Sequence, residues 1–311
     1  MENETKEVVS SSAETSRIYS LFYAFFLIPL MIVIFGILFY LLFAVITDEP
    51  TNINQLLAKL ESGSIRDKAN ASYRMNKLFF NDSTKYNSSY KERIIRIHKM
   101  SKSEFSLDNT LRLHTLMIMG NSRDSSFGPN LLEELNQNDE EFRIKAIEAL
   151  GKIQYFKSAS VIKNYLSKDN SFLEKLAAVG ALGNIGNKAA ITDLVKLIDA
   201  WPIDWLESDG PELRWEAAIA LLKLGYTSTK TIKIINNLLD RNYYLSSSGA
   251  SYNQLNENTV NFVILKILNI LSSIKQKSLL EPFNDKIKVL SIEDLNLEIR
   301  DFAKKYINQN K

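Results

Sequence analysis

The hydrophobic residues of the chain are concentrated in one long segment near its beginning. Residues 18–47 are thirty consecutive positions without a charged side chain, and nearly all of them are Leu, Ile, Phe, Val, Tyr or Ala. A helix of this length spans roughly 45 Å, which is more than the ~30 Å hydrocarbon core of a bilayer. Tyr19, Tyr23 and Tyr40 near its ends suit the membrane interfaces. Pro29 could kink the helix, or it could mark the point where an interfacial segment turns into the bilayer.

The sequences on either side of this segment distinguish a retained anchor from a cleaved signal peptide or a buried core helix. A signal peptide has a basic beginning, about 7–15 apolar residues and a small-residue cleavage site. Here the tail over residues 1–17 carries four glutamates, and the segment ends in Val45-Ile-Thr-Asp48, which is no cleavage site. We therefore predict a flexible polar tail over 1–17 and a single transmembrane helix over 18–47, which makes the lipid bilayer one partner of the chain.

The side of the membrane that holds the rest of the chain is only weakly indicated. The tail contains two basic residues, and two more follow within about twenty residues of the segment, so the count of positive charges does not decide. Arg17 lies directly before the segment, whereas Asp48 and Glu49 follow it. This arrangement favours a single-pass membrane protein with its main domain on the extracytoplasmic rather than the cytoplasmic side.

After residue 51 the apolar positions recur at spacings of three and four, and no stretch alternates convincingly with period two, which predicts helices throughout. The helical pattern also repeats itself. Four segments align residue by residue, with equivalent basic residues 31, 32 and 39 positions apart: 111–120, 142–151, 174–183 and 213–222. Less regular copies lie at 68–78, 261–269 and 300–306. Self-similarity at this period predicts stacked structural repeats.

A second amphipathic segment precedes each copy, so each repeat is predicted to be an antiparallel helical hairpin. These preceding segments are 54–61, 91–102, 130–135, 159–166, 190–198, 229–239 and 279–289. Alanines in the second helices predict close packing between neighbours, and Gly120, Gly151, Gly186 and Gly225 are predicted to end those helices. The sequence thus predicts an all-α solenoid of six or seven hairpins over residues 51–311.

These repeats resemble the HEAT-repeat family, and the Ala-Leu-Gly endings at 149–151 and 181–183 are similar to the subgroup related to phycobilisome lyases. The resemblance implies a ladder of acidic residues in the turns and basic residues early in the second helices. The basic members are Lys68, Arg112, Arg143, Lys175, Arg214 and Arg300. The acidic members are Asp108, Asp139, Asp169, Asp209 and Asp294. Each acid precedes a base by four to six residues, as Asp108 precedes Arg112, Asp139 precedes Arg143 and Asp294 precedes Arg300. The cations could bind a phosphate or an acidic partner, but their placement at the same position in every repeat favours a structural role.

The layout of the whole chain is similar to that of a group of bacterial proteins with a short tail, one membrane helix and a HEAT-like domain. The resemblance includes the segments Lys59–Tyr73 and Leu238–Tyr243. It implies a location in a bacterial inner membrane and an association with membrane complexes such as ABC-type transporters.

Composition excludes several classes of function. The 38 basic and 36 acidic residues nearly balance, which argues against a nucleic-acid partner held by bulk charge. The chain has no cysteine and only two histidines, His98 and His114, neither with an evident partner in the sequence. We therefore expect no metal and no cofactor. No nucleotide-binding loop or Gly-x-Ser-x-Gly motif occurs, and we expect a protein that is not an enzyme.

Two insertions are the candidate partner-binding loops. The first, residues 201–212, lengthens one repeat to 39 residues, and all three tryptophans lie in or beside it. Tryptophan is enriched in binding hot spots, although these rings could instead cover an apolar seam. The second insertion, residues 242–252, is rich in Ser and Tyr. The candidate contact residues are Trp201, Asp204, Trp205, Glu207, Trp215, Tyr243 and Tyr244.

A basic run on the segment 91–102 offers one further alternative. It could contact anionic headgroups because it follows the anchor closely, or it could simply be a solvated helix face. Its members are Lys91, Arg93, Arg96, Lys99 and Lys102.

Together these features predict a membrane-anchored, non-enzymatic scaffold or adaptor whose protein partners lie in or at the membrane. The alternative is a lyase- or chaperone-like factor that binds a hydrophobic ligand in a concave groove.

Overall fold

The computed structural model describes residues 22–47, 52–102, 109–167, 169–199, 211–246 and 256–309. The chain divides into two compact units, Met1–Gln55 and Leu56–Lys311. Six of the predicted functional or ladder residues lie outside the described residues: Asp108, Trp201, Asp204, Trp205, Glu207 and Asp209.

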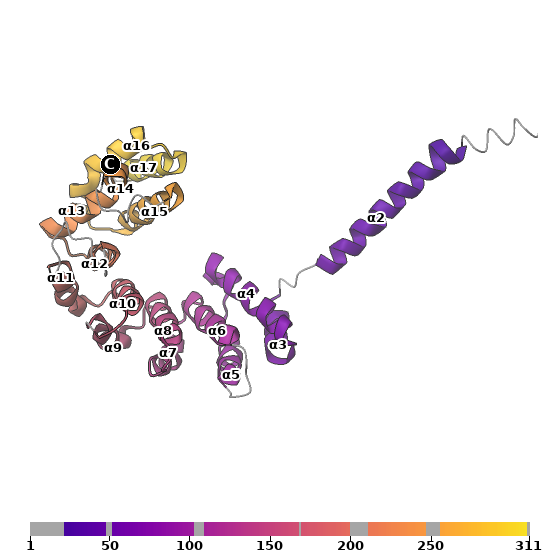
Figure 1. Cartoon of the computed structure of the whole chain (residues 1–311), viewed down its shortest axis with the longest axis horizontal. Coiled ribbons are helices and arrows are strands. Elements are labelled where there is room, and N and C mark those ends of the chain that lie inside the picture. The colour runs from indigo at the N-terminus through magenta and orange to yellow at the C-terminus, as the bar shows by residue number, and fades with distance from the viewer. Residues whose placement is uncertain are drawn as a thin grey trace, which may run out of the picture. The chain divides into compact units, whose positions relative to one another are not determined.

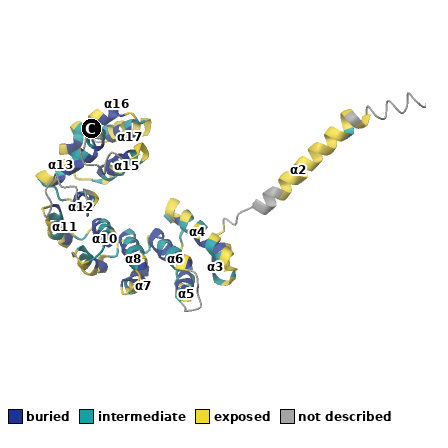
Figure 2. Ribbon diagram, in the orientation of Figure 1, coloured by how far each residue is buried: buried dark blue, intermediate teal, exposed yellow. Residues whose placement is uncertain are grey.

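The first unit contains one long helix. A π-helical turn, η1 (Tyr23–Leu27), leads into α2 (Ile28–Thr47). Pro29 has no N–H to donate to the carbonyl four residues earlier, which accounts for the wider turn directly before it. The window Phe25–Leu42 has a mean hydropathy of 2.8, and none of it is buried (Figure 2). The helix is therefore apolar and long enough to cross a membrane, and it is not the core helix of a globular domain.

In the part of the chain that the structure describes, the second unit contains seven antiparallel hairpins, within the predicted range of six or seven. The first helices of these hairpins are α3 (Ile53–Ser62), α5 (Lys91–Ser101), α7 (Gly128–Glu134), α9 (Ala159–Lys163), α11 (Ile191–Asp199), α13 (Thr229–Leu238) and α16 (Asn284–Glu293). The second helices are α4 (Ile65–Asn81), α6 (Asn109–Asn121), α8 (Glu140–Lys152), α10 (Phe172–Ile185), α12 (Pro211–Lys223), α15 (Glu257–Ser273) and α17 (Leu297–Gln309). A short helix, α14 (Arg241–Ser246), lies between α13 and α15.

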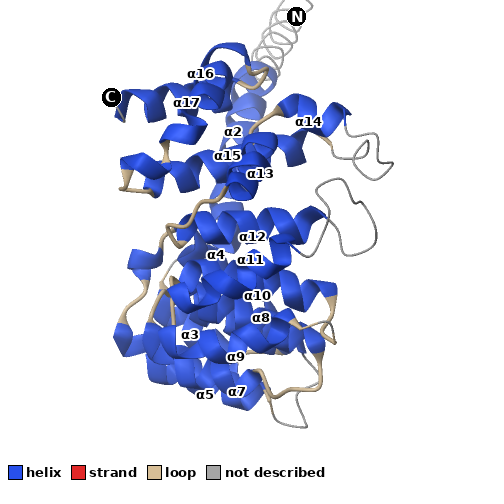
Figure 3. Cartoon of the chain, turned by 90° about the vertical axis from the view of Figure 1, so that its left-hand side faces the viewer, coloured by secondary structure: helices blue, strands red, loops and turns tan. Residues whose placement is uncertain are grey.

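The hairpins stack in chain order into a curved solenoid, with the second helices along its inner side and the first helices along its outer side (Figure 1). Viewed from the side, the stacked helices run nearly parallel to one another (Figure 3). The core lies between the two rows, where Phe79, Phe127, Phe283 and Tyr306 are almost completely buried. Because each hairpin packs on its neighbours, stability is distributed along the array.

Local sequence signals define several of the helix ends. Ser64 and Ser171 open α4 and α10 with capping boxes, in which each serine accepts a backbone N–H and a carboxylate three residues later reaches back. Gly186 and Gly225 follow α10 and α12 with φ angles of 79° and 74°, a conformation that favours glycine. These two glycines end their helices as predicted.

The other two glycines have a different role from the one predicted. Gly120 and Gly151 lie inside α6 and α8, at the point where each helix touches the next second helix. A Cβ atom on Gly151 would lie 2.7 Å from the Cα of Ala181, and one on Gly120 would lie 2.9 Å from the Cα of Ala149. Gly183 repeats this contact one hairpin later. The Ala-Leu-Gly motif therefore sets the close spacing of α6, α8, α10 and α12 instead of ending a helix.

Candidate protein-binding surface

The solvent-facing sides of the second helices form the inner surface of the solenoid (Figure 1). Large apolar side chains lie exposed along it. Tyr73 and Phe80 on α4 are 58% and 71% exposed, Leu173 on α10 is 55% exposed, and Phe262 on α15 is 67% exposed. Scattered single apolar side chains are ordinary on a protein surface, but aromatic groups repeated along one concave side are typical of a binding surface.

The stripe on α4 is the most regular part of this surface. Arg66, Tyr73, Lys77 and Phe80 follow one another at spacings of seven, four and three, so they lie along one side of the helix. All four side chains are exposed. The stripe thus alternates cations with aromatic rings, a combination that can bind an acidic and apolar segment of a partner.

A polar row lies at the C-terminal ends of four successive second helices, at equivalent positions of their repeats. Asn121, Lys152, Asn184 and Lys223 occupy these positions. The Nζ of Lys152 donates to the Oδ1 of Asn121 at 2.9 Å, and the Nζ of Lys223 donates to the Oδ1 of Asn184 at 2.8 Å. Burial lowers the pKa of both lysines from the ordinary value. These amines therefore serve mainly to join adjacent helices.

Carboxylates and amines are also paired on the inner surface. Lys145 and Glu148 pair within α8 at 3.0 Å, and Lys266 on α15 bonds to Glu216 on α12 at 2.6 Å. Gly180 exposes the backbone of α10 beside Glu216, whose Oε1 would lie 3.3 Å from an added Cβ. The inner surface thus combines charged side chains that form ion pairs with aromatic side chains that are exposed.

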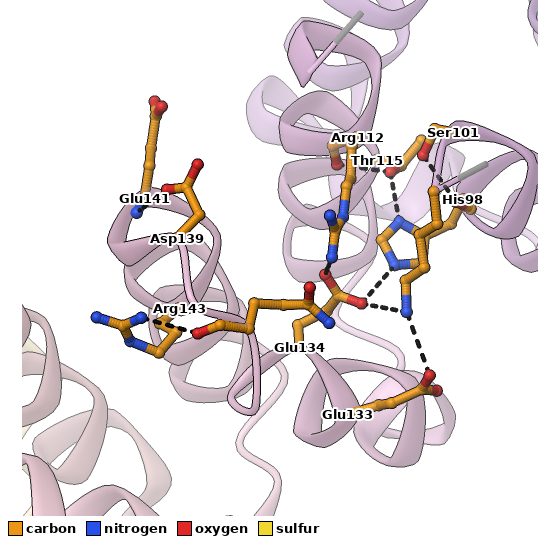
Figure 4. A network of polar contacts seen from close by, with 11 residues as sticks. His98, Ser101, Arg112, Thr115, Glu133, Glu134, Asp139, Glu141 and Arg143 are labelled. Atoms are coloured by element: carbon orange, nitrogen blue, oxygen red, sulfur yellow. Dashed lines mark hydrogen bonds and ion pairs between the residues drawn. The ribbon is translucent and has the colours of Figure 1, made fainter. Parts of the chain in front are cut away.

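A buried polar cluster joins the second and third hairpins around Glu134 at the end of α7 (Figure 4). The side chain of Glu134 is fully buried. Arg112 donates to its Oε2 from Nη2 at 2.7 Å and from Nε at 3.2 Å. Lys102 forms an ion pair with Oε1, and the Nε2 of His98 lies 3.3 Å from the same oxygen. The Nδ1 of His98 lies 2.8 Å from the hydroxyl of Thr115.

The electrostatics of this cluster favour an ionised Glu134. Burial acts to raise the pKa of Glu134, but hydrogen bonds from His98, Lys102 and Arg112 lower it to about 2. A buried carboxylate held by three basic groups locks one arrangement of neighbouring helices. The cluster therefore fixes the angle between the second and third hairpins.

The His98–Glu134 pair resembles an acid–base pair of an enzyme, but its surroundings favour a structural role. His98 is 1% exposed, and both of its ring nitrogens face groups of the protein. The Glu134 side chain is fully buried and also forms ion pairs with Lys102 and Arg112, as expected for a structural ion-pair network. Within the described residues, no group of three or more His, Cys, Asp or Glu side chains is arranged to hold a metal ion.

Two basic residues of the predicted ladder, Arg112 and Arg143, bind glutamates that do not belong to it. Asp108, the acid that precedes Arg112, lies outside the described residues. Arg143 donates from Nε to Glu174 at 2.7 Å and from Nη1 to two backbone carbonyls, while Asp139 accepts the N–H of Glu141 as the cap of α8. Arg112 binds Glu134, as described above. Asp139 thus caps α8, and Arg143 binds a carboxylate of the next repeat instead.

The last acid of the ladder also has another partner than the one predicted. The carboxylate of Asp294 is almost completely buried and binds Arg241 of α14 at 2.8 and 3.2 Å, instead of Arg300. It also accepts the N–H of Asn296 at 2.9 Å. Lys175 and Arg214 are buried, Lys68 and Arg300 are half-buried, and Asp169 is exposed.

Three of the predicted contact residues come together in one aromatic cluster. The ring centroid of Trp215 on α12 lies 6.3 Å from that of Tyr243 and 6.2 Å from that of Tyr244, both on α14. Tyr244 is 3% exposed and donates its hydroxyl to the carbonyl of Leu238 at 2.8 Å. Tyr244 is therefore a core residue and not a contact residue, whereas Trp215 and Tyr243 are half-buried.

Sequence reasoning missed both Glu134 and the partners of His98. A signal was present, because Glu134 lies three residues after Leu131 and one before Leu135, both of which are buried. An acid within the apolar stripe of a helix must be paired or hydrogen-bonded when it is buried. The same holds for His98 beside Ile94 and Ile97.

Two comparisons with known proteins find similarity. Residues 128–203 match the family model of HEAT repeats. A solved structure, the complex of CpcE and CpcF of phycocyanin lyase from Nostoc sp. PCC7120, superposes with a TM-score of 0.54 at 15% sequence identity, covering 85% of this chain and 96% of that chain. At this identity the similarity extends to the fold alone. No curated protein sequence matches the chain.

Proposed function

Since the chain is a HEAT-repeat α-solenoid, we propose that it is a non-enzymatic adaptor, anchored in a membrane by α2, which binds another protein along its inner surface. Solenoids of this kind expose extended concave surfaces that are suited to long partners. We propose the bilayer itself as the second partner, through residues 18–47.

The observation that carries this proposal is the row of exposed aromatic and aliphatic groups on the inner surface. Tyr73, Phe80, Leu173 and Phe262 come from three different repeats, yet all are more than half exposed. A monomer that leaves such groups in water loses the stabilisation that their burial provides, about 1.5–3 kcal/mol for each fully buried side chain. A partner that covers the surface recovers this free energy.

Photo-crosslinking in intact membranes tests the proposal. A photoreactive phenylalanine analogue replaces Phe80 or Phe262 on the inner surface, and the cross-linked partner is then identified by mass spectrometry. Phe156 is the matched control, because it is 63% exposed but lies in the turn η5 (Phe156–Ser158) that leads to the outer helix α9.

We expect cross-links to the same partner from positions 80 and 262 and none from position 156. Cross-links from position 156 alone would contradict the inner surface as the binding site. A turnover reaction of the purified chain that one point substitution abolishes would contradict the non-enzymatic part of the proposal.

The first partner class to test is a membrane complex such as an ABC-type transporter. This choice rests on the resemblance of the segments Lys59–Tyr73 and Leu238–Tyr243 to membrane-anchored HEAT-like proteins. A transporter subunit among the cross-linked proteins supports it, and soluble partners alone count against it.

A second candidate function rests on the same exposed aromatic groups, and the solved structure of similar fold is a phycocyanin lyase complex. In this alternative function, the same aromatic groups bind a hydrophobic small molecule in the concave groove. Native mass spectrometry of the chain purified in mild detergent distinguishes the two functions, because a stoichiometric bound compound supports the ligand-binding function and a co-purifying protein supports the adaptor.

A further inference from the structure

We propose that the outer surface of the first two hairpins docks on anionic phospholipid headgroups of the bilayer that holds α2. The docking surface consists of Lys59 on α3 together with Arg96, Lys99 and Met100 on α5, and we call it the basic outer surface. The inference rests on the proposed membrane anchor and adds a second, electrostatic contact to it.

The charge of the chain is unevenly distributed. Residues 52–102 contain eleven basic and four acidic side chains, a formal net charge of +7. Residues 103–311 contain 25 basic and 26 acidic side chains, a net charge of −1. The near-zero net charge of the whole sequence thus conceals a strongly basic end of the solenoid. The positive electrostatic field of this end attracts polyanions.

Several charged groups of this basic end are engaged within the fold. Arg93 of α5 holds Glu61 of α3 through two hydrogen bonds at 2.9 and 2.6 Å. Asp67 belongs to the capping box of α4, and Asp82 caps the turn that follows it. Lys102 faces inward to the cluster around Glu134. Two members of the basic run, Arg93 and Lys102, are therefore structural.

Three further cations are exposed on the first helices of these two hairpins. Lys59 is exposed on α3, and Arg96 and Lys99 are exposed on α5 at a spacing that places them on one side of the helix. Met100 lies beside them and is 45% exposed. Both helices belong to the outer row of the solenoid (Figure 1), where the convex side can approach a flat surface. Cations around an exposed apolar side chain suit the headgroup region of a bilayer.

The covalent connection to the anchor keeps this surface near the membrane. Helix α2 ends at Thr47 and α3 begins at Ile53, so the intervening chain spans at most about 20 Å. The Debye length at physiological ionic strength is about 8 Å. The tether therefore keeps the beginning of α3 within a few screening lengths of the end of α2, which favours the lipid surface over a soluble acidic protein or RNA as the occupant.

The proposal has a consequence for orientation. The negative surface potential of a membrane belongs mainly to its cytoplasmic leaflet. Docking of the basic outer surface thus favours the cytoplasmic side for the solenoid, opposite to the side favoured by the charges directly beside the anchor.

A fluorescence experiment on the full chain tests the proposal. The natural chain has no cysteine, so a single reporter can be placed by Ser62→Cys on the exposed end of α3, or by Asn308→Cys on the distant α17. The labelled chain is reconstituted in vesicles of phosphatidylcholine, with or without phosphatidylglycerol, that contain a headgroup-attached quencher. The test variant is Lys59→Gln/Arg96→Gln/Lys99→Gln. The control, Lys157→Gln/Lys188→Gln/Lys233→Gln, removes three exposed cations from later repeats.

We expect phosphatidylglycerol to increase quenching of the reporter at position 62 and not of the reporter at position 308. Each cation near an anionic surface contributes about 1 kcal/mol, or about fivefold, so the test variant lowers the docked-to-undocked ratio about 100-fold while the control leaves it unchanged. Salt at about 1 M abolishes the difference, because the Debye length falls to about 3 Å.

Resistance of the chain to alkaline extraction from the vesicles reports insertion of α2 separately. A chain that inserts but shows equal quenching with and without phosphatidylglycerol overturns the docking proposal and leaves the anchor standing. Quenching that the test variant does not reduce, or that is equal at both reporters, overturns it as well. A chain that is extracted contradicts the anchor itself.

Discussion

The cluster around Glu134 makes a quantitative prediction about local stability. In Glu134→Gln the three basic groups His98, Lys102 and Arg112 remain, but the carboxylate that holds them is gone. Because the Glu134 side chain is fully buried, solvent cannot replace it. Removing one partner of a buried ion pair costs about 3–5 kcal/mol. The pKa gives a similar magnitude, since lowering it from 4.5 to about 2 corresponds to about 3 kcal/mol.

Hydrogen–deuterium exchange of the full chain in detergent is the suitable assay, because it measures opening helix by helix and does not require the whole array to unfold in one step. We expect amides of α5, α6 and α7 in the variant to exchange about 100-fold faster or more, whereas α16 and α17 are unchanged. Glu133→Gln is the matched control. The neighbouring Glu133 side chain is 65% exposed and meets Lys102 at 3.4 Å, so its loss is expected to cost less than about 0.5 kcal/mol.

The pH dependence of the stability that Glu134 provides is an independent check, because the direction of the change can be predicted. A carboxylate with a lowered pKa in the folded state stabilises the fold above its unfolded pKa of about 4.5, and this stabilisation is lost as the pH falls from 4.5 towards 2. Protection of α5–α7 in the natural chain therefore falls over this range and approaches that of Glu134→Gln. Equal protection of the two chains at pH 7 would refute the reasoning.

Three further predictions concern packing, the last repeats and the anchor. Gly151→Ala places a Cβ 2.7 Å from the backbone of α10 and is expected to cost about 2 kcal/mol in thermal unfolding, whereas Gly180→Ala meets only a flexible carboxylate and is expected to be neutral or stabilising. Asp294→Ala leaves Arg241 without its carboxylate and should increase exchange of α14–α17 about 100-fold, while the same change at the fully exposed Asp285 should not. Deleting the segment 18–47 should release the chain from alkaline-washed membranes, and continued retention would contradict the anchor.

The architecture could be predicted from the sequence because it depends on periodic, local signals. Spacings of three and four defined the helices, and the repeated basic position defined the hairpins. The segment 91–102 corresponds to α5, which ends at Ser101, and the segment 229–239 corresponds to α13, which ends at Leu238. These boundaries follow from apolar periodicity and capping, both of which act over a few residues.

The ion pairs could not be predicted in the same way, because they depend on distances between repeats. Arg143 meets Glu174, 31 residues away, and Arg241 meets Asp294, 53 residues away. In both cases an acid nearer in the sequence is already engaged. Asp139 caps α8, and Asp240 binds Lys286. The role of Gly151 was missed for a related reason, since glycine near a helix end predicts termination unless the next helix is known to lie against it.

The division between paired and exposed groups also bears on which residues recognise a partner. The periodic arginines at 112 and 143 are used between neighbouring repeats, so they provide stability and little specificity. The groups that remain available are the ones that do not repeat: Phe80 and Phe262 on the inner surface and the cations of the basic outer surface. Because a repeat array is stabilised by nearest-neighbour contacts, such exposed residues can change without loss of the fold. Substitutions there should therefore separate binding from stability, whereas substitutions in the periodic positions should not.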